Sequence, residues 1–260
     1  MEVNKLYCMD NLELLKQLPD ESIDLIYCDI LYNTGRKFKD YDDNLGTPQE
    51  AIEWYKPRLV EMRRVLKNTG NIYLHMDYRL IHYMKVEMDV IFGINNFRNE
   101  IIWSYRTGGV SKRWFQKKHD NILKYSKSEK YTHNPLFEKS YMESSGFINA
   151  NINSESSKKL GLQRDNIGTY RNVHMRDVWD INIIYNNDSQ QVGYISQKPK
   201  LLLERIISAS SNEGDVVADF FMGSGTTCVV AKELGRNYIG CDINPRAIEI
   251  TTTRLNNKGE

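Results

Sequence analysis

Residues 219–227 have the sequence Asp219-Phe220-Phe221-Met222-Gly223-Ser224-Gly225-Thr226-Thr227, which links a predicted strand to a predicted helix through small residues. Residues 215–218 before it are typical of a short buried strand, and residues 226–234 are typical of a helix. Gly223 and Gly225 allow the backbone to lie close to a ligand and to adopt positive φ. The first helical turn offers free N–H groups beside them. The stretch therefore predicts a strand–loop–helix unit with a ligand site at the glycine loop.

A second predicted strand follows this unit and ends in an acid. Residues 237–242 finish at Asp242, where nucleotide-binding α/β folds place the carboxylate that holds a ribose diol. The loop has no third glycine for a pyrophosphate turn, and the chain has no Gly-x-x-x-x-Gly-Lys-Ser/Thr phosphate loop. Two glycines after a strand can also form only a tight turn. Together with Asp242, however, they favour a nucleoside cofactor without a phosphate chain, for which S-adenosylmethionine is the candidate.

The composition is that of one α/β domain with an insertion. The chain has 260 residues, 40% hydrophobic and 27% charged, with a net charge of +1. It contains no long apolar run and no signal peptide, so we expect a cytoplasmic protein without membrane contact. The four cysteines have no metal-ligand spacing, so we expect free thiols and no metal site.

A basic segment lies between two predicted strands, 97–105 and 121–126. Such a segment can be an ordinary solvated surface, but its density of positive charge suits a polyanion. We therefore predict that it contacts nucleic acid, through Arg106, Lys112, Arg113, Lys117 and Lys118.

The N-terminal half predicts a second cluster at the same sheet edge. Residues 23–28 form a buried strand candidate that delivers Asp29 to its carboxyl end, where open α/β sheets bind ligands, and Tyr32 follows three residues later. Residues 36–48 are polar and predict an exposed loop. Helices are expected at 49–66, 79–91 and 201–211, with further strands at 3–9 and 71–76. Residues 131–192 are rich in Asn and Ser and lack periodicity, which indicates an inserted, loop-rich region between core segments 1–130 and 193–260.

Three motifs in this order, Asp29 to Gly35, Gln197-Lys198-Pro199 and residues 219–227, resemble the β class of DNA amino-methyltransferases. This class includes type II methylases and the modification subunits of type III restriction systems, which act on adenine N6 or cytosine N4. The resemblance implies a Rossmann-like, S-adenosylmethionine-dependent methyltransferase fold with a doubly wound, mostly parallel sheet. It also implies a circularly permuted order and a target-recognition region at 131–192.

The sequence departs from the family at the catalytic tetrad. The usual Asp-Pro-Pro-Tyr is replaced by Asp29, Ile30, Leu31 and Tyr32. An exocyclic amino nitrogen is a poor nucleophile because its lone pair is delocalised, and two acceptors on its N–H bonds direct that lone pair at the methyl donor. Asp29, the Ile30 carbonyl and the Tyr32 ring still supply these groups, so the substitution removes proline rigidity and no functional group.

The resemblance also assigns cofactor contacts across the chain. For Asp10 a helix-capping role is almost as good an interpretation, because Glu13 follows it in a capping-box arrangement. The implied cofactor-binding residues are Asp10, Leu12, Asp29, Lys198, Asp219, Phe221, Met222, Gly223, Ser224, Gly225, Thr226, Thr227, Asp242 and Ile243.

The implied activity is methyl transfer from S-adenosylmethionine to adenine N6 in double-stranded DNA, with the base rotated out of the stack. The Asp at the start of the tetrad favours adenine. Cytosine-N4 or RNA base methylation is the first alternative, and a DNA-binding relative that retains the cofactor pocket but has weakened catalysis is the second. A homodimer and a restriction endonuclease partner are left open.

Overall fold

The computed structural model describes residues 1–109, 111–194 and 196–257, without the side chain of Ser145. The chain divides into two compact units. The larger consists of Met1–Asn134 and Asp177–Glu260, and the smaller of Pro135–Arg176. Val110 and Ile195, in the basic segment and before the Gln197-Lys198-Pro199 motif, lie outside the described residues.

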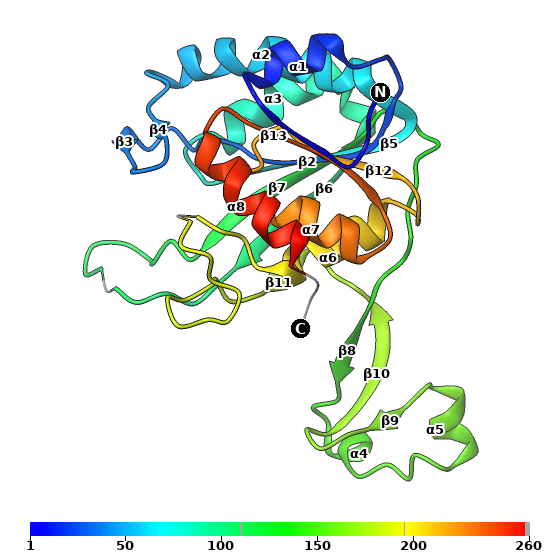
Figure 1. Cartoon of the computed structure of the whole chain (residues 1–260). Coiled ribbons are helices and arrows are strands. Elements are labelled where there is room, and N and C mark those ends of the chain that lie inside the picture. The colour runs from blue at the N-terminus through cyan, green and yellow to red at the C-terminus, as the bar shows by residue number, and fades with distance from the viewer. Residues whose placement is uncertain (110, 195, 258–260) are drawn as a thin grey trace. The chain divides into compact units, whose positions relative to one another are not determined.

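The larger unit is built on an eight-stranded mixed sheet (Figure 1). Its neighbouring strands are parallel except that β7 runs antiparallel to both β5 and β6. The predicted α/β class with a mostly parallel sheet is therefore confirmed. In spatial order the strands are β1 (Lys5–Cys8), β13 (Asn237–Asp242), β12 (Val216–Asp219), β2 (Ile23–Asp29), β5 (Leu66–Met76), β7 (His119–Ser126), β6 (Phe97–Ser104) and β11 (Val178–Asp180).

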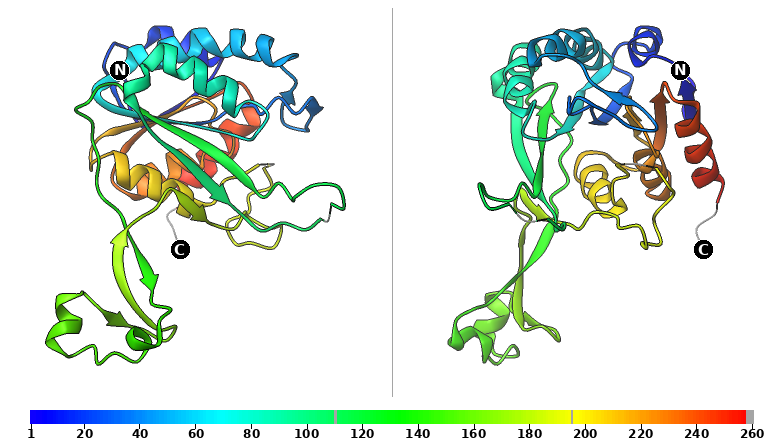
Figure 2. Two further views of the ribbon diagram at one scale, coloured as in Figure 1. Left: turned by 180° about the vertical axis from the view of Figure 1, so that it is seen from behind. Right: turned by 90° about the vertical axis from the view of Figure 1, so that its left-hand side faces the viewer.

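Helices cover both faces of this sheet (Figure 2). One layer contains α1 (Asn11–Gln17), α2 (Pro48–Val65) and α3 (Ile81–Phe92), followed by a short 3-10 turn, η1 (Ile94–Asn96). The other contains α6 (Lys200–Ser210), α7 (Thr226–Glu233) and α8 (Pro245–Asn256). Apolar side chains of the central strands, such as Ile26, Leu74 and Ile239, are fully buried between the layers.

Local sequence explains where α2 begins. Thr47 caps the helix in a complete capping box with Glu50, and Pro48 occupies the first turn, where its missing N–H costs nothing. The helix continues through Pro57 to Val65. The following strand begins at Leu66, earlier than the residue 71 that the sequence predicts.

The smaller unit has more regular structure than its composition predicts. It contains an antiparallel sheet in the order β8-β10-β9, with bounds Phe137–Tyr141, Thr169–His174 and Gln163–Arg164, and two short helices, α4 (Ser145–Ile148) and α5 (Glu155–Lys159). Cross-strand ring pairs, Phe137 with His174 and Tyr141 with Tyr170, lie 4.8 Å and 5.6 Å apart and support this sheet.

The inserted region is also shorter than 131–192. Asn134 already bonds to α6 through the Ser208 carbonyl, 3.0 Å away. Residues 177–192 belong to the larger unit, because Val178–Asp180 pairs with β6. No helix in the described part of the chain has the length and apolar character needed to cross a bilayer.

Candidate active site

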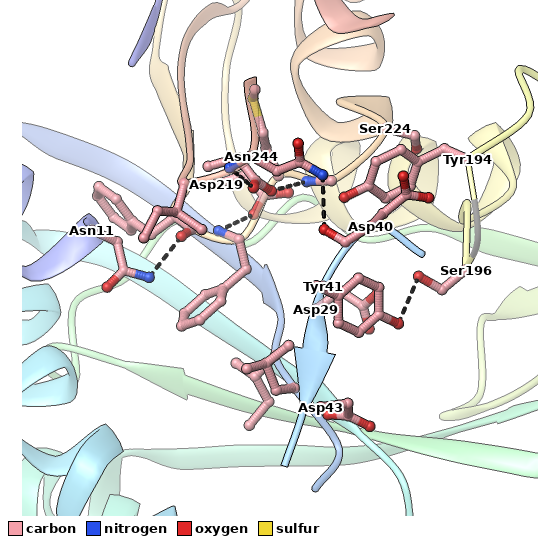
Figure 3. Close-up of a pocket in the computed structure, with 18 of the residues that line it drawn as sticks. Asn11, Asp29, Asp40, Tyr41, Asp43, Tyr194, Ser196, Asp219, Ser224 and Asn244 are labelled. Atoms are coloured by element: carbon pink, nitrogen blue, oxygen red, sulfur yellow. Dashed lines mark hydrogen bonds between the residues drawn. The ribbon is translucent and has the colours of Figure 1, made fainter. Parts of the chain in front are cut away.

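Three strands of the large sheet end in acids that face one cavity of about 540 Å³ (Figure 3). Asp29 ends β2, Asp219 ends β12 and Asp242 ends β13, and all three line the cavity. The three strands are parallel, so their carboxyl ends meet at one edge of the sheet. Gly223 lines the same cavity, so the two distant motifs predicted from the sequence form one site.

The two glycines of the loop have different roles. Gly223 has φ +49° and lines the cavity, and its N–H donates to Asp242 Oδ2 at 2.9 Å. Gly225 has φ +72° and does not line the cavity. A Cβ at Gly225 would lie 2.2 Å from the Thr251 side chain, so this glycine lets α7 pack on α8. Gly225, predicted as a cofactor-binding residue, therefore supports the loop through packing and does not itself line the cavity.

Asp219 accepts hydrogen bonds from both sides of the glycine loop. The side chain is buried, Oδ1 accepts from the Phe221 N–H at 3.0 Å, and Oδ2 accepts from the Thr227 hydroxyl at 2.6 Å. Burial raises the pKa of Asp219 to about 7, despite these two hydrogen bonds. The other predicted loop residues that line the cavity are Phe221, Met222, Ser224, Thr226, Thr227 and Ile243.

Asp10, one of the predicted cofactor-binding residues, lines another wall of the cavity. Asp10 caps α1 through the Leu12 N–H, 2.8 Å away, and its second oxygen pairs with Arg58 at 2.8 Å. Leu12 does not line the cavity. Trp54, which does, lies 3.5 Å from the Arg58 guanidinium. Sequence reasoning missed Trp54, although its spacing from Arg58 on α2 indicates a stacked pair.

The catalytic tetrad is held in place without prolines. The Ile30 side chain is buried, and its N–H donates to the His75 carbonyl at 3.2 Å. The Tyr55 hydroxyl donates to the Leu31 carbonyl at 3.0 Å. Asp43 accepts from the N–H of both Asn33 and Thr34 at 3.0 Å. These contacts hold the backbone at Ile30 and Leu31, the two positions where the resembled family has prolines.

Asp29 and Tyr32, the two ends of the tetrad, contact each other at the cavity wall. The Tyr32 hydroxyl donates to Asp29 Oδ1 at 2.8 Å, and Lys198 Nζ donates to Asp29 Oδ2. Burial and the nearby charge of Asp29 raise the pKa of Tyr32 well above its ordinary value, so the phenol stays a donor. The structure thus pairs Lys198 with the predicted catalytic carboxylate, in addition to placing it on the cavity wall.

A hairpin covers part of the cavity, where the sequence predicted only an exposed loop. It consists of β3 (Arg36–Lys37) and β4 (Asp42–Asp43), and the residues at its turn line the cavity. Asp40 in that turn forms an ion pair with Arg246, and its carbonyl accepts from Asn244 Nδ2 at 2.8 Å (Figure 3). Most residues of 36–48 are exposed as predicted, but Asp40 and its neighbours in the turn are held against the cavity by Arg246 and Asn244.

A second cavity of about 580 Å³ shares its wall with the first at Tyr32, Tyr194, Ser196 and Lys198. Asp120, at the start of β7, lines this second cavity. Sequence reasoning missed Asp120 because only the antiparallel direction of β7 brings the beginning of that strand to the edge where β2 and β5 end.

Four of the five predicted DNA-contacting residues are exposed, and Lys118 is half-buried. Lys112 and Arg113 are exposed on the segment between β6 and β7. Lys118 donates to the carbonyls of Thr107 and Gly108 at 2.9 Å and 2.7 Å, which closes the base of the segment. The other two lie near local partners, Lys117 at 3.6 Å from the Tyr78 ring centroid and Arg106 at 3.9 Å from Asp180.

The first cavity fits S-adenosylmethionine in chemistry as well as size. The volume lies in the range of small-molecule sites. Aromatic and aliphatic side chains such as Trp54, Phe221 and Met222 suit an adenosyl group, and the carboxylates of Asp29 and Asp242 suit a cationic ligand with a ribose diol. The bare backbone at Gly223 leaves room that a side chain would take, since a Cβ there would lie 3.2 Å from Tyr194.

Comparison with known proteins agrees with this geometry. A family model described as "DNA methylase", of the N6/N4 type, matches residues 23–253. The chain belongs to this family of DNA methylases. The methylase is 33% identical over 255 residues to the type II methyltransferase M.HpaI of Haemophilus parainfluenzae, covering 98% of this chain and 74% of that protein. It is 32% identical to the DNA adenine methyltransferase YhdJ of Escherichia coli K12, covering 95% and 80%.

Solved structures share the fold of the methylase. The M1.HpyAVI–SAM complex aligns with a TM-score of 0.60 and 21% identity over 97% of this chain and 98% of that one. The PvuII DNA methyltransferase, described as cytosine-N4-specific, aligns with a TM-score of 0.69 and 19% identity, covering 100% and 89%. The methylase is therefore an S-adenosylmethionine-dependent DNA methyltransferase of the N6/N4 family with the predicted Rossmann-like fold.

Proposed function

We propose that this protein methylates adenine N6 in double-stranded DNA, with the target base extruded into the site. The observation that carries the proposal is the position of Asp29, whose carboxylate lines the glycine-loop cavity and contacts Tyr32. The carboxylate is thus an anionic acceptor in the first cavity, and its partner Tyr32 also lines the second cavity.

The proposed roles follow from the chemistry of an amino group. Bound S-adenosylmethionine supplies an electrophilic methyl group on a sulfonium cation. One N–H of the adenine amino group donates a hydrogen bond to Asp29 and the other donates to the Ile30 carbonyl. These two bonds direct the nitrogen lone pair toward that methyl group. The Tyr32 ring stacks on the base. The carboxylate of Asp29 also favours the positive charge that develops on nitrogen during transfer.

Two observations support adenine as the target. The tetrad begins with Asp29, as in the adenine-N6 members that this sequence resembles. YhdJ, 32% identical over most of both chains, is named a DNA adenine methyltransferase.

The position of the tetrad supports base extrusion. Only 18% of the Asp29 side chain is exposed, within the first cavity, and a base within a duplex cannot reach such a carboxylate. Contacts to DNA are then assigned to the basic segment, with Lys118 at its base and four exposed residues, Arg106, Lys112, Arg113 and Lys117, and recognition of the target sequence to the unit Pro135–Arg176. We also propose that the acid–aromatic motif preceding the glycine loop along the chain represents the permuted order of the β class.

The test uses the purified chain with labelled S-adenosylmethionine and unmodified duplex DNA. We expect label in DNA, and nucleoside analysis should identify it as N6-methyladenine. Asp29→Asn and Asp29→Ala should reduce transfer by about 100-fold or more, because an acceptor acting in the transition state is removed, and should retain cofactor binding.

Asp20→Asn, at an exposed acid outside both cavities, is the matched control and should keep wild-type activity. Label in N4-methylcytosine would reject adenine as the target. Full activity in Asp29→Ala would reject the role of Asp29.

A further inference from the structure

Asp120 is a second buried carboxylate beside the proposed catalytic one. Its residue is 8% exposed, and it lines the second cavity on the far side of Tyr32 from the cofactor cavity. The Tyr32 hydroxyl donates to both carboxylates, to Asp29 Oδ1 at 2.8 Å and to Asp120 Oδ2 at 3.2 Å. One hydroxyl has a single proton, so it is shared between these two acceptors.

Two further side chains, Tyr105 and His75, lie beside Asp120. The Tyr105 hydroxyl donates to Oδ1 at 3.0 Å, and His75 Nε2 approaches Oδ2 to 3.4 Å. His75 Nδ1 lies 2.7 Å from the Tyr27 hydroxyl. Burial raises the pKa of Tyr27 well above its ordinary value, so Tyr27 stays protonated beside the imidazole.

The charge of Asp120 is also maintained. Burial alone would raise the pKa of Asp120, but the His75 imidazole and the Lys198 ammonium hold it below its ordinary value. Asp120 is therefore an anion with donors arranged around it, one of which is the hydroxyl of the tetrad tyrosine.

We propose that Asp120 is a positioning residue for methyl transfer, which holds the Tyr32 hydroxyl when Asp29 turns to the target amino group. This role rests on the proposed function. It follows from the hydrogen bonds that both oxygens of Asp29 already accept. Asp29 Oδ1 accepts a hydrogen bond from the Tyr32 hydroxyl, and Oδ2 accepts one from Lys198 Nζ. When an amino N–H binds to Asp29, the Tyr32 hydroxyl retains Asp120 as acceptor, so the ring that faces the base stays in one plane.

The test is a double-mutant cycle between Asp120 and Tyr32. Asp120→Asn keeps the size of the side chain and removes its charge. We expect kcat to fall roughly 10- to 100-fold, the loss for a hydrogen bond to a charged group. The cofactor Kd and the KM for DNA should stay within about twofold. Adding Asp120→Asn to Tyr32→Phe should cause little further loss, because the hydroxyl through which Asp120 acts is already absent.

Two controls separate this role from general destabilisation. Asp77→Asn removes another acid that is 8% exposed, close to the end of β5 and outside both cavities, and should leave kcat unchanged. Tyr105→Phe removes a different donor to Asp120 and should lower kcat less than threefold. If Asp120→Asn does not fold, Asp120→Ala replaces it in the same cycle, with cofactor binding as the test of folding.

The outcomes distinguish this inference from the proposed function. Active wild-type protein with an unimpaired Asp120→Asn variant would overturn the role of Asp120 alone, as would losses that multiply in the double mutant. Absence of methyl transfer by the wild-type protein would overturn the proposed function and this role together.

Discussion

Asp219 carries the clearest consequence at the scale of single residues. Its pKa is raised by burial from an ordinary 3.8 to about 7, so the folded chain keeps a proton on this carboxyl that the unfolded chain releases. Between these two values the folded state binds more protons than the unfolded state. The contribution of Asp219 to stability is therefore complete below about pH 4 and is lost as the pH rises through about 7.

We expect Asp219→Asn to remove this pH dependence. The amide can still accept from the Phe221 N–H and donate to the Thr227 hydroxyl, so the loop keeps its hydrogen bonds. The free energy of unfolding of the variant should improve relative to wild type by at most about 4 kcal/mol between pH 4 and 7.5, from a shift of about three pKa units. Urea denaturation across this range measures the difference, and parallel curves for the two proteins would contradict it.

Much of the residue-level site could be predicted because its motifs are local. The acids Asp29, Asp219 and Asp242 each follow a short buried strand, and that pattern is visible in a single sequence. Asp120 could not be found in this way, because it begins a strand and reaches the site only through antiparallel pairing with β5. Trp54 reaches the cavity from the middle of a long helix, through packing that a sequence does not specify.

Among the elements, the segment between β6 and β7 gives a test of DNA binding. Lys112 and Arg113 are exposed, whereas the Lys118 ammonium is engaged with backbone carbonyls. We expect the double variant Lys112→Glu, Arg113→Glu to bind duplex DNA more weakly. The slope of log K against log salt should become shallower by about 0.9 for each phosphate group that the variant no longer neutralises.

Binding of the cofactor should not change in this variant, because neither residue lines the cofactor cavity. The control is Lys16→Glu, at an exposed position on α1, which should leave affinity and slope unchanged. An unaltered salt slope in the double variant would assign DNA binding to other residues.

The start of a helix could be predicted where a neighbouring residue caps it. Elements whose position depends on long-range contacts were missed. Asp10, which the sequence indicates as a helix cap, does cap α1. The β3–β4 hairpin has no such signal, because its order depends on Arg246 and Asn244, about two hundred residues further along the chain. Polar composition alone therefore predicted an open loop.

The whole molecule separates into a cofactor-binding unit and the smaller unit Pro135–Arg176, whose boundaries favour a clean deletion. The smaller unit begins and ends at one place, since the Met175 N–H donates to the Leu136 carbonyl at 2.9 Å. We expect replacement of residues 136–175 by a short Gly-Ser linker to preserve cofactor binding within a few-fold. The cavity that we assign to the cofactor is lined by none of the described residues of that unit.

Methylation of specific DNA sites should disappear in the deletion protein. Mapping of methylated bases in the DNA of cells that express each protein measures this, with the full-length chain as reference. An identical pattern of modified sites in both proteins would refute a recognition role for Pro135–Arg176.

The parallel core of the molecule could be predicted, but the limits of its insertion could not. Loss of periodicity marked residues 131–192, yet 177–192 return to the large sheet as β11 and its following loop. Three residues, Val178–Asp180, are too short a strand to give an alternating pattern in sequence.

Strands from the two ends of the chain pair with each other, β2 with β12 and β1 with β13. Neither half of the polypeptide therefore contains a complete sheet. A chain cut within the smaller unit would yield one fragment with the acid Asp29 and another with the glycine bend. Each fragment would have an unpaired strand edge and half of a site. Methyl transfer would then report the reunion of two separately made pieces, which makes this fold a natural basis for a split enzyme whose output is a permanent mark on DNA.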